Sequence, residues 1–369
     1  MARLLFFTSP IGLGHASRDI AIADALVDAG ISKDEITFIT SSPASSHIME
    51  HGYHVLEAYR RKSIDARDGT FRHKLLWLLD YVSFYRECKG IASSILHEHK
   101  PDLVISDEDF ASISTAGALS IKSVLITDVF ESRFLDGLPS LLEGILNRSL
   151  KGIITRADMV IVPMYAHEHG YGYPSSNMVY VGPIVRRVEK GRDELRRALG
   201  FNGYKVILVS VGGTASGRFL IKRAIDAYTR IVDCIGMPTK LVIVSGPSID
   251  PTHLHSHSHI PDSVATAAGR IEYHGYIKNM HEMIYAADLL ISLAGRSTMD
   301  EARVYGTPSI FIPIKGHFEQ EDNAKVYGFS HSDIYRLEDL ILKHITDKRM
   351  GAITSYGAYE AAKRVYQLT

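Results

Sequence analysis

The sequence predicts an α/β protein with two doubly wound domains, each built on a parallel sheet with helices on both faces. Three observations lead to this prediction. The chain has 369 residues, which is more than one hydrophobic core usually organises. Short apolar segments of strand length alternate with helical patterns along the chain. A strand, a glycine-rich turn and a helix follow one another at the head of each half, first from Ala2 and again from Lys205.

The strands of the two sheets are expected at the apolar segments. In the first half these are Ala2–Thr8, Ile36–Thr40, Tyr53–Glu57, Leu103–Ser106, Val124–Thr127 and Met159–Val162. In the second half they are Lys205–Val211, Leu241–Ser245, Ile271–His274, Leu289–Leu293 and Ser309–Pro313. Apolar residues at helical spacing predict a first helix over Ser17–Ala29, which stops at Gly30, and a last helix within Gly351–Leu368. We therefore expect domains at 1–183 and 201–350, joined by a charged linker at 184–200.

Composition restricts the class of protein. Hydrophobic residues make up 46% of the chain and the formal net charge is −1, which fits a globular protein and argues against a general nucleic-acid binder. Only Cys88 and Cys234 are present, so a disulfide framework is not expected and a reducing compartment is. No signal peptide precedes the first strand, and no apolar run approaches the roughly 20 residues that span a bilayer. We expect a cytoplasmic protein.

The stretch 288–324 carries the strongest functional signal. Its first strand runs into Ala294-Gly295-Arg296, after which Ser297-Thr298 are expected to cap a helix with Asp300 and Glu301 in its first turn and its end at Gly306. The second strand leads into an expected polar loop with His317, Glu319, Gln320, Asp322 and Asn323. A helix N-terminus attracts phosphate, a carboxylate binds a ribose diol, and amides suit sugar hydroxyls. This chemistry predicts a nucleotide-sugar pocket.

Two motifs in this stretch resemble the donor-binding segment of the GT-B glycosyltransferases, in the branch of the bacterial lipid I N-acetylglucosaminyltransferases and UDP-glycosyltransferases. Ser297-Thr298-Met299-Asp300-Glu301-Ala302 and Glu319-Gln320-Glu321-Asp322-Asn323-Ala324 follow that family's order and spacing. The resemblance implies two Rossmann-like domains facing a central cleft, with the final helix, 351–369, returning to the first domain. It implies transfer of a sugar from UDP, such as N-acetylglucosamine, to an acceptor hydroxyl, with inversion and without a metal or other cofactor.

The resemblance also implies the site residues. The glycine loop after Val211 and the helix start after Ala294 would hold the diphosphate, and Tyr276-Ile277-Lys278-Asn279-Met280 would lie over the uracil ring. Glu301 would hold the ribose, and Gln320 and Asn323 would reach the sugar. The full expected donor set is Gly12, Gly14, Arg186, Gly212, Gly213, Thr214, Ile277, Met280, Gly295, Arg296, Ser297, Thr298, Glu301, His317, Glu319, Gln320 and Asn323.

His15 is the candidate catalytic base. It follows the glycine turn Gly12-Leu13-Gly14 after the first strand, where the family has a glycine-glycine-histidine loop, and histidine with its ordinary pKa near about 6.5 suits proton removal from a hydroxyl. Asp107, at another strand end, would orient it. Asp107-Glu108-Asp109 also forms an Asp-x-Asp motif, which binds a divalent cation in another glycosyltransferase fold. We discount the metal because the nucleotide motifs lie in the other half of the chain.

Other motifs point elsewhere or stay open. The first turn has Ser17 where a dinucleotide fingerprint has its third glycine, and the loop 212–217 lacks the Lys-Ser/Thr of a P-loop. The histidines at 253, 255, 257 and 259 form a tract that suits a metal only if it is a strand. A non-hydrolysing UDP-sugar epimerase, a nucleotide-sugar-binding subunit without activity and a nicotinamide-dependent oxidoreductase are the competing functions.

Two segments combine apolar and basic residues. The clusters Arg60-Arg61-Lys62 and Arg72-His73-Lys74 precede the aromatic run Leu75–Tyr85, which contains Trp77. The segment Pro139–Ala157 is amphipathic, with Arg148, Lys151 and Arg156 among its polar positions. Such helices lie on a membrane surface or pack on a sheet. The first alternative would bring the protein to the inner face of the cell membrane, where it would meet a lipid-linked acceptor.

Overall fold

A computed structural model of the protein describes residues 3–64, 66–168, 176–250, 252, 269–350 and 355–369. The chain forms two compact units. Unit 1 contains Met1–Ser63, His73–Arg186 and Ser355–Thr369, and unit 2 contains Ile64–Arg72 and Arg187–Thr354. Each unit has its own parallel sheet, so the predicted α/β class with two doubly wound domains is confirmed.

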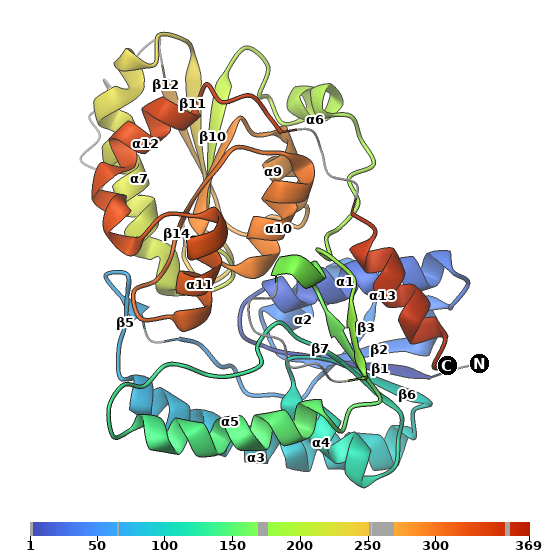
Figure 1. Cartoon of the computed structure of the whole chain (residues 1–369). Helices are drawn as coiled ribbons and strands as arrows, with labels where there is room; N and C mark the ends of the chain where they lie inside the picture. The colour runs from blue at the N-terminus through green and yellow to red at the C-terminus, as the bar shows by residue number, and fades with distance from the viewer. Residues whose placement is uncertain (1–2, 65, 169–175, 251, 253–268, 351–354) are drawn as a thin grey trace. The chain divides into compact units, whose positions relative to one another are not determined.

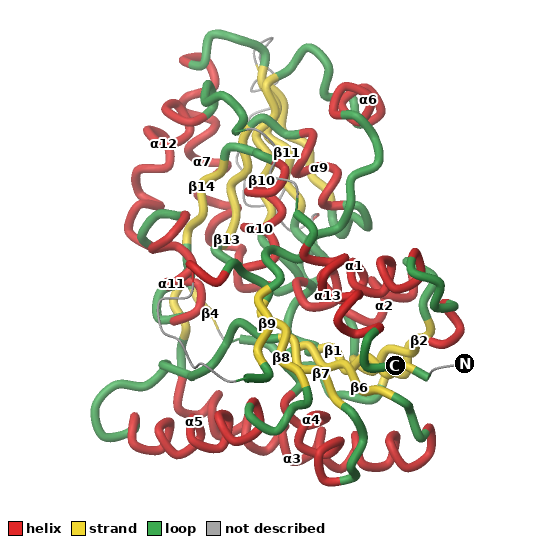
Figure 2. Tube along the Cα trace, turned by 45° about the vertical axis from the view of Figure 1, so that its right-hand side comes forward, coloured by secondary structure: helices red, strands yellow, loops and turns green. Residues whose placement is uncertain are grey.

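Unit 1 is built on a seven-stranded sheet whose strands are all parallel (Figure 2). In spatial order the strands are β3 (His54–Glu57), β2 (Ile36–Thr40), β1 (Leu4–Thr8), β6 (Leu103–Asp107), β7 (Ser123–Ile126), β8 (Met159–Val162) and β9 (Met178–Tyr180). β6 is the central strand and β1 is its neighbour; the last residue of β1, Thr8, pairs with Asp107, the last residue of β6. The turn after β1 and the turn after β6 are therefore neighbours at one edge of the sheet.

Helices cover both faces of this sheet (Figure 1). Leu4 and Phe6 share a buried cluster with α1 (Gly14–Asp28), α2 (Ala44–Glu50) and α13 (Gly357–Tyr366). Leu5 and Phe7, which point to the opposite face, share a cluster with α3 (Lys74–His99) and α4 (Phe110–Ala118). α5 (Ser140–Ile154) packs at that face with β7 and β8. Near-continuous apolar strands are typical of a sheet buried on both faces.

Unit 2 is built on a five-stranded parallel sheet. In spatial order its strands are β12 (Gly269–His274), β11 (Thr239–Val244), β10 (Lys205–Ser210), β13 (Leu289–Leu293) and β14 (Ser309–Ile312). Among the described residues its α-helices include α6 (Arg192–Ala198), α7 (Arg218–Ile231), α9 (Met280–Ala286), α10 (Arg296–Tyr305), α11 (Phe318–Tyr327) and α12 (Leu337–His344). Asp288 ties α6 to this sheet, because its carboxylate accepts from the Val206 backbone N–H at 2.9 Å and from Arg196 at 3.0 Å.

The segment Ile64–Arg72 belongs to unit 2, although the expected boundaries placed it inside the first domain. It forms a hairpin of β4 (Ala66–Arg67) and β5 (Thr70–Phe71). The Phe71 N–H donates to the Lys315 carbonyl at 2.9 Å, and the Lys315 N–H donates to the Gly69 carbonyl at 2.8 Å. Gly69 has a φ of +74°, and a Cβ there would lie 2.7 Å from His331. The sequence analysis did not predict this hairpin, although Asp68-Gly69, both with positive φ, form the kind of two-residue turn that favours one.

The end of the chain lies in unit 1. α13 packs against α1 through Ala361, Ala362 and Val365, which are buried. The Ser355 hydroxyl donates to the Pro183 carbonyl at 2.5 Å, and a Cβ on Gly357 would lie 2.1 Å from the same oxygen. The helix expected within Gly351–Leu368 is thus shorter, beginning at Gly357, and its first positions, 351–354, lie outside the described residues.

Candidate active site

His15 and Asp107 meet at the carboxyl edge of the seven-stranded sheet. Gly12 takes a φ of +84° in the turn after β1, which lets the chain reverse into α1 with Gly14 as the first helical residue. His15 follows in the first turn of α1, and its Nδ1 lies 2.9 Å from the Asp107 Oδ1. The His15 side chain is 19% exposed while Asp107 is buried. One ring nitrogen of His15 is therefore held by a buried carboxylate, while the side chain as a whole stays partly accessible.

Arg18 completes this contact, and the sequence analysis missed it. It lies three residues after His15 on α1, so both side chains project from one face of the helix. Its Nε donates to Asp107 Oδ2 at 2.7 Å and its Nη2 donates to Oδ1 at 2.5 Å. Burial raises the pKa of Asp107, but the charges and hydrogen bonds of Arg18 and His15 outweigh it and hold that pKa below its ordinary value. The i, i+3 spacing of two basic residues was the available signal.

Glu108 faces the other side of the His15 ring. Its Oε2 lies 3.7 Å from His15 Nε2, and its backbone has a φ of +53°, a strained value for glutamate that marks functional positions. Burial lowers the pKa of His15, but the charge and hydrogen bond of Asp107, with the charge of Glu108, raise it to about 9. The ordinary pKa assumed from the sequence is therefore wrong for this ring.

A further carboxyl group lies behind the pair. Asp19 is fully buried, and one of its oxygens accepts from the Thr8 hydroxyl at 2.5 Å. Burial, together with the charge of Asp107, raises the pKa of Asp19 well above its ordinary value. The raised pKa favours the protonated form of Asp19 beside the Asp107 carboxylate.

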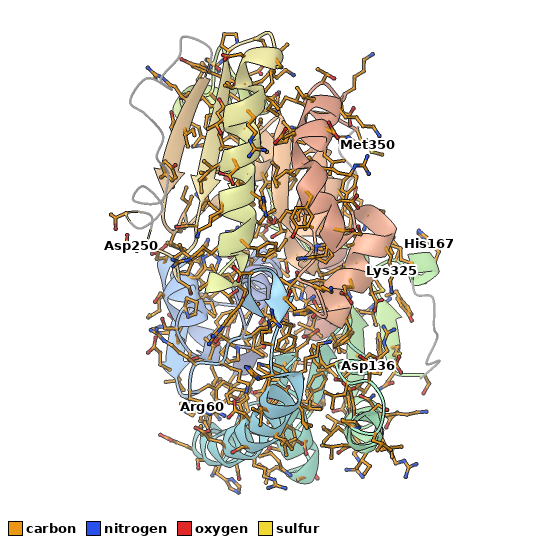
Figure 3. All side chains as sticks on the ribbon, turned by 90° about the vertical axis from the view of Figure 1, so that its left-hand side faces the viewer. Arg60, Asp136, His167, Asp250, Lys325 and Met350 are labelled. Carbon is orange, nitrogen blue, oxygen red and sulfur yellow. The ribbon has the colours of Figure 1, made fainter. Side chains whose placement is uncertain are left out.

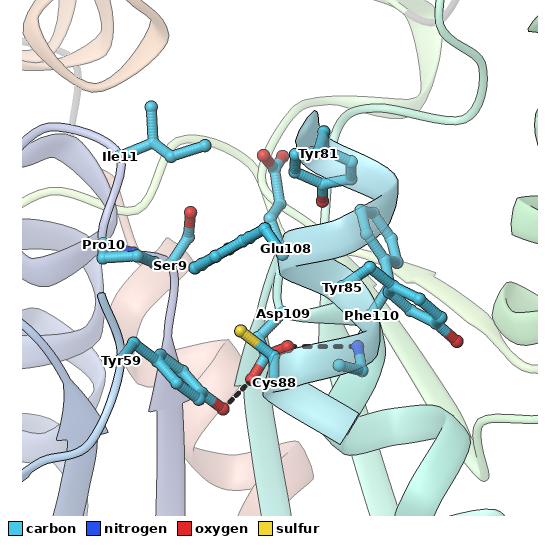
Figure 4. A pocket seen from close by; sticks show the side chains of 12 residues that line it. Ser9, Pro10, Ile11, Tyr59, Tyr81, Tyr85, Cys88, Glu108, Asp109 and Phe110 are labelled. Atoms are coloured by element: carbon cyan, nitrogen blue, oxygen red, sulfur yellow. Dashed lines mark hydrogen bonds between the residues drawn. The ribbon is translucent and has the colours of Figure 1, made fainter. Parts of the chain in front are cut away.

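A pocket in unit 1 opens beside Glu108 (Figure 4). Asp109 forms part of its wall, where it accepts from the Tyr59 hydroxyl and caps α4 through the N–H groups of Ala111 and Ser112. Burial raises the pKa of Asp109 to about 6 despite these hydrogen bonds. The complete lining is Ser9, Pro10, Ile11, Tyr59, Tyr81, Phe84, Tyr85, Cys88, Glu108, Asp109, Phe110 and Ala111. The lining thus combines aromatic side chains with the carboxyl groups of Glu108 and Asp109.

The Asp-x-Asp motif is therefore divided between two structural tasks. Asp107 binds Arg18 and His15, while Asp109 binds Tyr59 and the start of α4. Among the residues that the structure describes, no three His, Cys, Asp or Glu side chains are grouped as a metal site. The histidine tract at 253, 255, 257 and 259 lies outside the described residues.

In unit 2, the expected donor residues gather at the carboxyl edge of the five-stranded sheet. β10 pairs with β13, and β13 with β14, so the segments that follow these strands are neighbours. Gly212 (φ +76°), Gly213 and Thr214 follow β10, Gly295 to Thr298 follow β13, and His317 to Asn323 follow β14. Gly213 is held by Ser248, whose hydroxyl donates to its carbonyl at 2.6 Å.

The start of α10 differs from the prediction. Gly295 occupies the N-cap position and the helix begins at Arg296, so Ser297 and Thr298 are helical and cap nothing. Asp300 and Glu301 consequently lie in the second turn. Asp300 binds Arg296, with Nε 2.9 Å from Oδ2, and Glu301 is buried at 6% exposure. Glycine lacks a capping side chain, which leaves the first N–H groups of α10 without one. The predicted end at Gly306 is confirmed by its φ of +70°.

The expected polar loop after β14 is also wrong, because residues 318–327 form α11 with His317 at its N-cap. Only Ala324 of this helix is buried, so the sequence lacked the apolar stripe that predicts a helix. Gln320 Oε1 accepts from the Ile314 N–H at 3.0 Å, and Asn323 Nδ2 donates to the Ala294 carbonyl at 3.2 Å. Asn323 thereby connects α11 to the segment before α10.

The remaining predicted residues are placed as follows. Met280 is the first residue of α9, and Ile277 precedes it in the turn after β12. Glu319 lies in the first turn of α11, and Lys325, whose side chain is 73% exposed, points outward from the same helix (Figure 3). Arg186 is buried and is the last residue of the segment His73–Arg186 of unit 1. Gly12 and Gly14 also belong to unit 1, whereas the other expected donor residues belong to unit 2.

Comparisons with known proteins agree with this arrangement. Residues 206–339 match the glycosyltransferase family 28 C-terminal domain. An uncharacterised glycosyltransferase of Methanosarcina acetivorans is 26% identical over 341 residues, covering 88% of this chain and 83% of its own. A UDP-N-acetylglucosamine–N-acetylmuramyl-(pentapeptide) pyrophosphoryl-undecaprenol N-acetylglucosamine transferase of Clostridium kluyveri is 23% identical, covering 91% of this chain and 87% of its own.

A solved structure gives the same fold. The glycotransferase of kitacinnamycin superposes with a TM-score of 0.67 at 14% identity, covering 100% of this chain and 99% of its own. The fold and the family 28 match define the class: the protein is a glycosyltransferase of the GT-B fold. More particularly, the match to the family 28 C-terminal domain, residues 206–339, falls within its second unit.

Proposed function

We propose that this glycosyltransferase transfers a hexose, with N-acetylglucosamine as the first candidate, from UDP to an acceptor hydroxyl. The observation that carries this proposal is the setting of His15: Asp107 binds its Nδ1, and its Nε2 lies 3.7 Å from Glu108, which lines the pocket. A hydroxyl is a weak nucleophile until a base removes its proton, and an oriented histidine at an open sheet edge suits that task.

The donor side of the proposal rests on unit 2. The backbone N–H groups at the start of α10 and in the loop Gly212–Thr214 suit a diphosphate, and Glu301 suits a ribose diol. His317, Gln320 and Asn323 lie at the same sheet edge for the sugar. The Clostridium relative's name specifies UDP-N-acetylglucosamine, which supports this donor as the first candidate.

The proposed reaction is a single displacement with inversion. The acceptor oxygen forms a bond to the anomeric carbon, the bond from that carbon to the diphosphate breaks, and UDP leaves with the electron pair. The acceptor proton passes to Nε2 of His15, while Nδ1 remains on Asp107. Helix and backbone N–H groups stabilise the leaving diphosphate without a metal. With a pKa of about 9, about 1% of His15 is neutral at pH 7, so activity should rise with pH toward 9.

For the acceptor, we propose a lipid-linked molecule that the protein reaches while bound to a membrane surface. α5 and the residue before its cap expose Leu138 (84%), Leu141 (70%) and Ile145 (67%), and Arg148 and Lys151 are exposed on the same helix. α3 exposes Leu76 (65%) and Leu79 (49%) at the same face of the sheet. Apolar side chains with cations beside them suit an anionic lipid surface. Within the described residues, no helix has the length and apolar content to cross a bilayer.

The basic cluster at Arg60–Lys62 does not support this surface. Arg60 is paired with Asp80 at 2.8 Å and Glu87 at 3.0 Å, and Lys62 is buried against Asp80 and over the Trp77 ring. Arg60 and Lys62 form ion pairs with acidic residues of unit 1. The proposed membrane surface therefore rests on α5 and on the start of α3.

The test is release of free UDP from a panel of UDP-sugars, with UDP-N-acetylglucosamine first, in the presence of lipid-linked and soluble acceptors. His15→Ala should lower kcat by about 10²–10⁴-fold while UDP affinity, measured by calorimetry, is unchanged. His97→Ala, an exposed histidine on α3, is the matched control and should keep wild-type turnover.

The competing functions give different results. An epimerase converts the UDP-sugar without an acceptor and releases it with UDP still attached. A binding subunit shows UDP affinity without turnover of any sugar. If His15→Ala keeps most of its turnover, the base is another group, with Asp107 or Asp109 examined next.

A further inference from the structure

Arg18 is attached to Asp107 at two points. Its side chain is 4% exposed, Nε reaches Oδ2 at 2.7 Å, and Nη2 reaches Oδ1 at 2.5 Å. The same Oδ1 lies 2.9 Å from His15 Nδ1, and Arg18 Nη2 lies 3.4 Å from that nitrogen. One carboxylate oxygen is therefore shared between the guanidinium and the imidazole.

The two-point attachment fixes the plane of the carboxylate. A carboxylate held by one hydrogen bond turns about its last side-chain torsion, whereas the planar guanidinium fork allows a single orientation. Because His15 receives its orientation from Oδ1, the fork sets the position of the His15 ring as well. Arg18 itself is buried beneath the ring and has a second carboxylate, Asp128, at 3.5 Å from Nη1.

The charges around His15 come from three parts of unit 1. The end of β6 contributes Asp107 and Glu108, which both favour the protonated ring. α1 contributes Arg18, which opposes protonation of the ring, and Asp19, whose pKa is raised well above its ordinary value by burial and by the charge of Asp107. The segment after β7 contributes Asp128 through its contact with Arg18. Arg18 is thus the positive charge that counters two acids at the ring.

We propose that Arg18 is a positioning residue for the transfer reaction: it fixes the Asp107 carboxylate and takes up part of its charge, so that Asp107 orients His15 without holding its proton too tightly. This inference rests on the proposed role of His15 as the base. The two-point contact of the Arg18 guanidinium orients the Asp107 carboxylate, and its positive charge favours loss of the proton from His15.

The first test needs no substrate. The pKa of His15 is measured by NMR on histidine-labelled protein, with the His15 signal assigned from its loss in His15→Gln. In Arg18→Gln, Asp107 and Glu108 act on the ring without a countercharge, so the pKa of His15 should rise by about one unit. In Arg18→Lys the charge is kept, and the His15 pKa should stay near the wild-type value.

The second test measures turnover. Arg18→Gln should lower kcat at pH 7 by about 10–100-fold with the KM for the donor unchanged, and should move the rising limb of its pH profile upward. Arg18→Lys cannot make the two-point contact with Asp107, so kcat should fall severalfold. The pH at which kcat rises should stay at its wild-type value. The inference is overturned if His15 titrates in Arg18→Gln as in wild type, or if Arg18→Lys keeps the full wild-type kcat.

Arg196→Gln is the matched control. Arg196 is also a buried arginine on an aspartate, with Nη1 3.0 Å from Asp288 Oδ2, but it lies in unit 2. Its loss should lower thermal stability without moving the His15 titration. If Arg18→Gln does not fold, Arg18→Lys decides the orientation step by its kcat. If no nucleotide sugar is turned over, the proposed function fails, and the NMR titration still decides the effect of Arg18 on His15.

Discussion

The two ring nitrogens of His15 face carboxylates from consecutive residues. Asp107 is the last residue of β6, and Glu108, which follows it, adopts a left-handed backbone conformation; Asp107 lies 2.9 Å from Nδ1 and Glu108 lies 3.7 Å from Nε2. Together they outweigh the effect of burial and of Arg18, and the pKa of His15 rises to about 9. A pKa of about 9 favours the protonated ring at neutral pH, so under the proposed mechanism the rate should follow the small neutral fraction of His15.

Removing the charge of Glu108 should make His15 a better base at neutral pH. Glu108 raises the pKa of His15, so Glu108→Gln should lower it below 9 and shift the rising limb of kcat/KM to lower pH. At pH 7 the neutral fraction of His15, and with it the rate, should increase severalfold. The measurement is the pH profile of UDP release.

The control for this prediction is Glu98→Gln, an exposed glutamate on α3, which should leave the pH limb in place. A Glu108→Gln profile that coincides with the wild-type profile would contradict an electrostatic role for Glu108. If Glu108→Gln instead raises the KM for the acceptor and leaves the pH dependence of kcat/KM unchanged, Glu108 takes part in acceptor binding.

At the scale of elements, a side-chain hydrogen bond connects α11 to the segment just before α10. Gly295 begins α10 without a capping side chain, and Asn323 of α11 donates to the Ala294 carbonyl just before it. Gln320 binds the Ile314 N–H and so fixes α11 to the end of β14. The two amides that were expected to bind sugar thus also hold the protein backbone, which orients α11 at the sheet edge.

Glu301 tests the donor side at this scale. It is buried on α10, so we choose Glu301→Gln, which keeps the volume and removes only the charge. If Glu301 binds a ribose diol, this change should weaken UDP binding by about 1.5–3 kcal/mol, the range for a hydrogen bond to a charged group. Calorimetry with UDP measures the effect.

Glu272→Gln serves as the control for Glu301, because Glu272 is a glutamate of unit 2 that binds Lys240 at 2.7 Å. It should leave UDP affinity unchanged. Equal UDP affinity in Glu301→Gln and wild type would remove Glu301 from the donor site.

At the scale of the whole molecule, the two units are not simple consecutive halves of the chain. Ile64–Arg72 belongs to unit 2 and Ser355–Thr369 belongs to unit 1, so the chain passes between the units more than once. Unit 1 carries the exposed apolar residues of α3 and α5 on the sheet face opposite α1 and α13. That face is where the proposed membrane contact would form.

Vesicle binding tests this contact. The protein should co-sediment with vesicles rich in anionic lipid at low salt and less at high salt, because the cations of α5 add electrostatic attraction. The double variant Leu141→Asp, Ile145→Asp should abolish most of the binding without loss of thermal stability, since both side chains are exposed. Met350→Asp, which changes an exposed residue of unit 2, should bind as wild type. Absence of binding by the wild-type protein would leave α3 and α5 as helices that pack on the sheet.

The sequence by itself determined the fold class and most strands. β2, β8 and β13 have the predicted bounds, because fully buried parallel strands are continuous apolar runs and need no partner to be recognised. It also pointed to His15 and Asp107, since a histidine after a glycine turn and an acid at a strand end lie at the ligand-binding edge of a doubly wound sheet. These features are local in the chain.

Tertiary structure alone decided the features that depend on distant residues. α11 is a polar helix held by Gln320 and Asn323 to two other segments, and hydrogen bonds with Lys315 attach the hairpin at Ile64–Arg72 to unit 2. The pKa of His15 depends on Arg18, Asp107 and Glu108, which meet only when β1 pairs with β6. Hydrogen bonds and electrostatic interactions act through space over a few ångströms, so a pattern along the chain does not contain them until the fold brings those residues together.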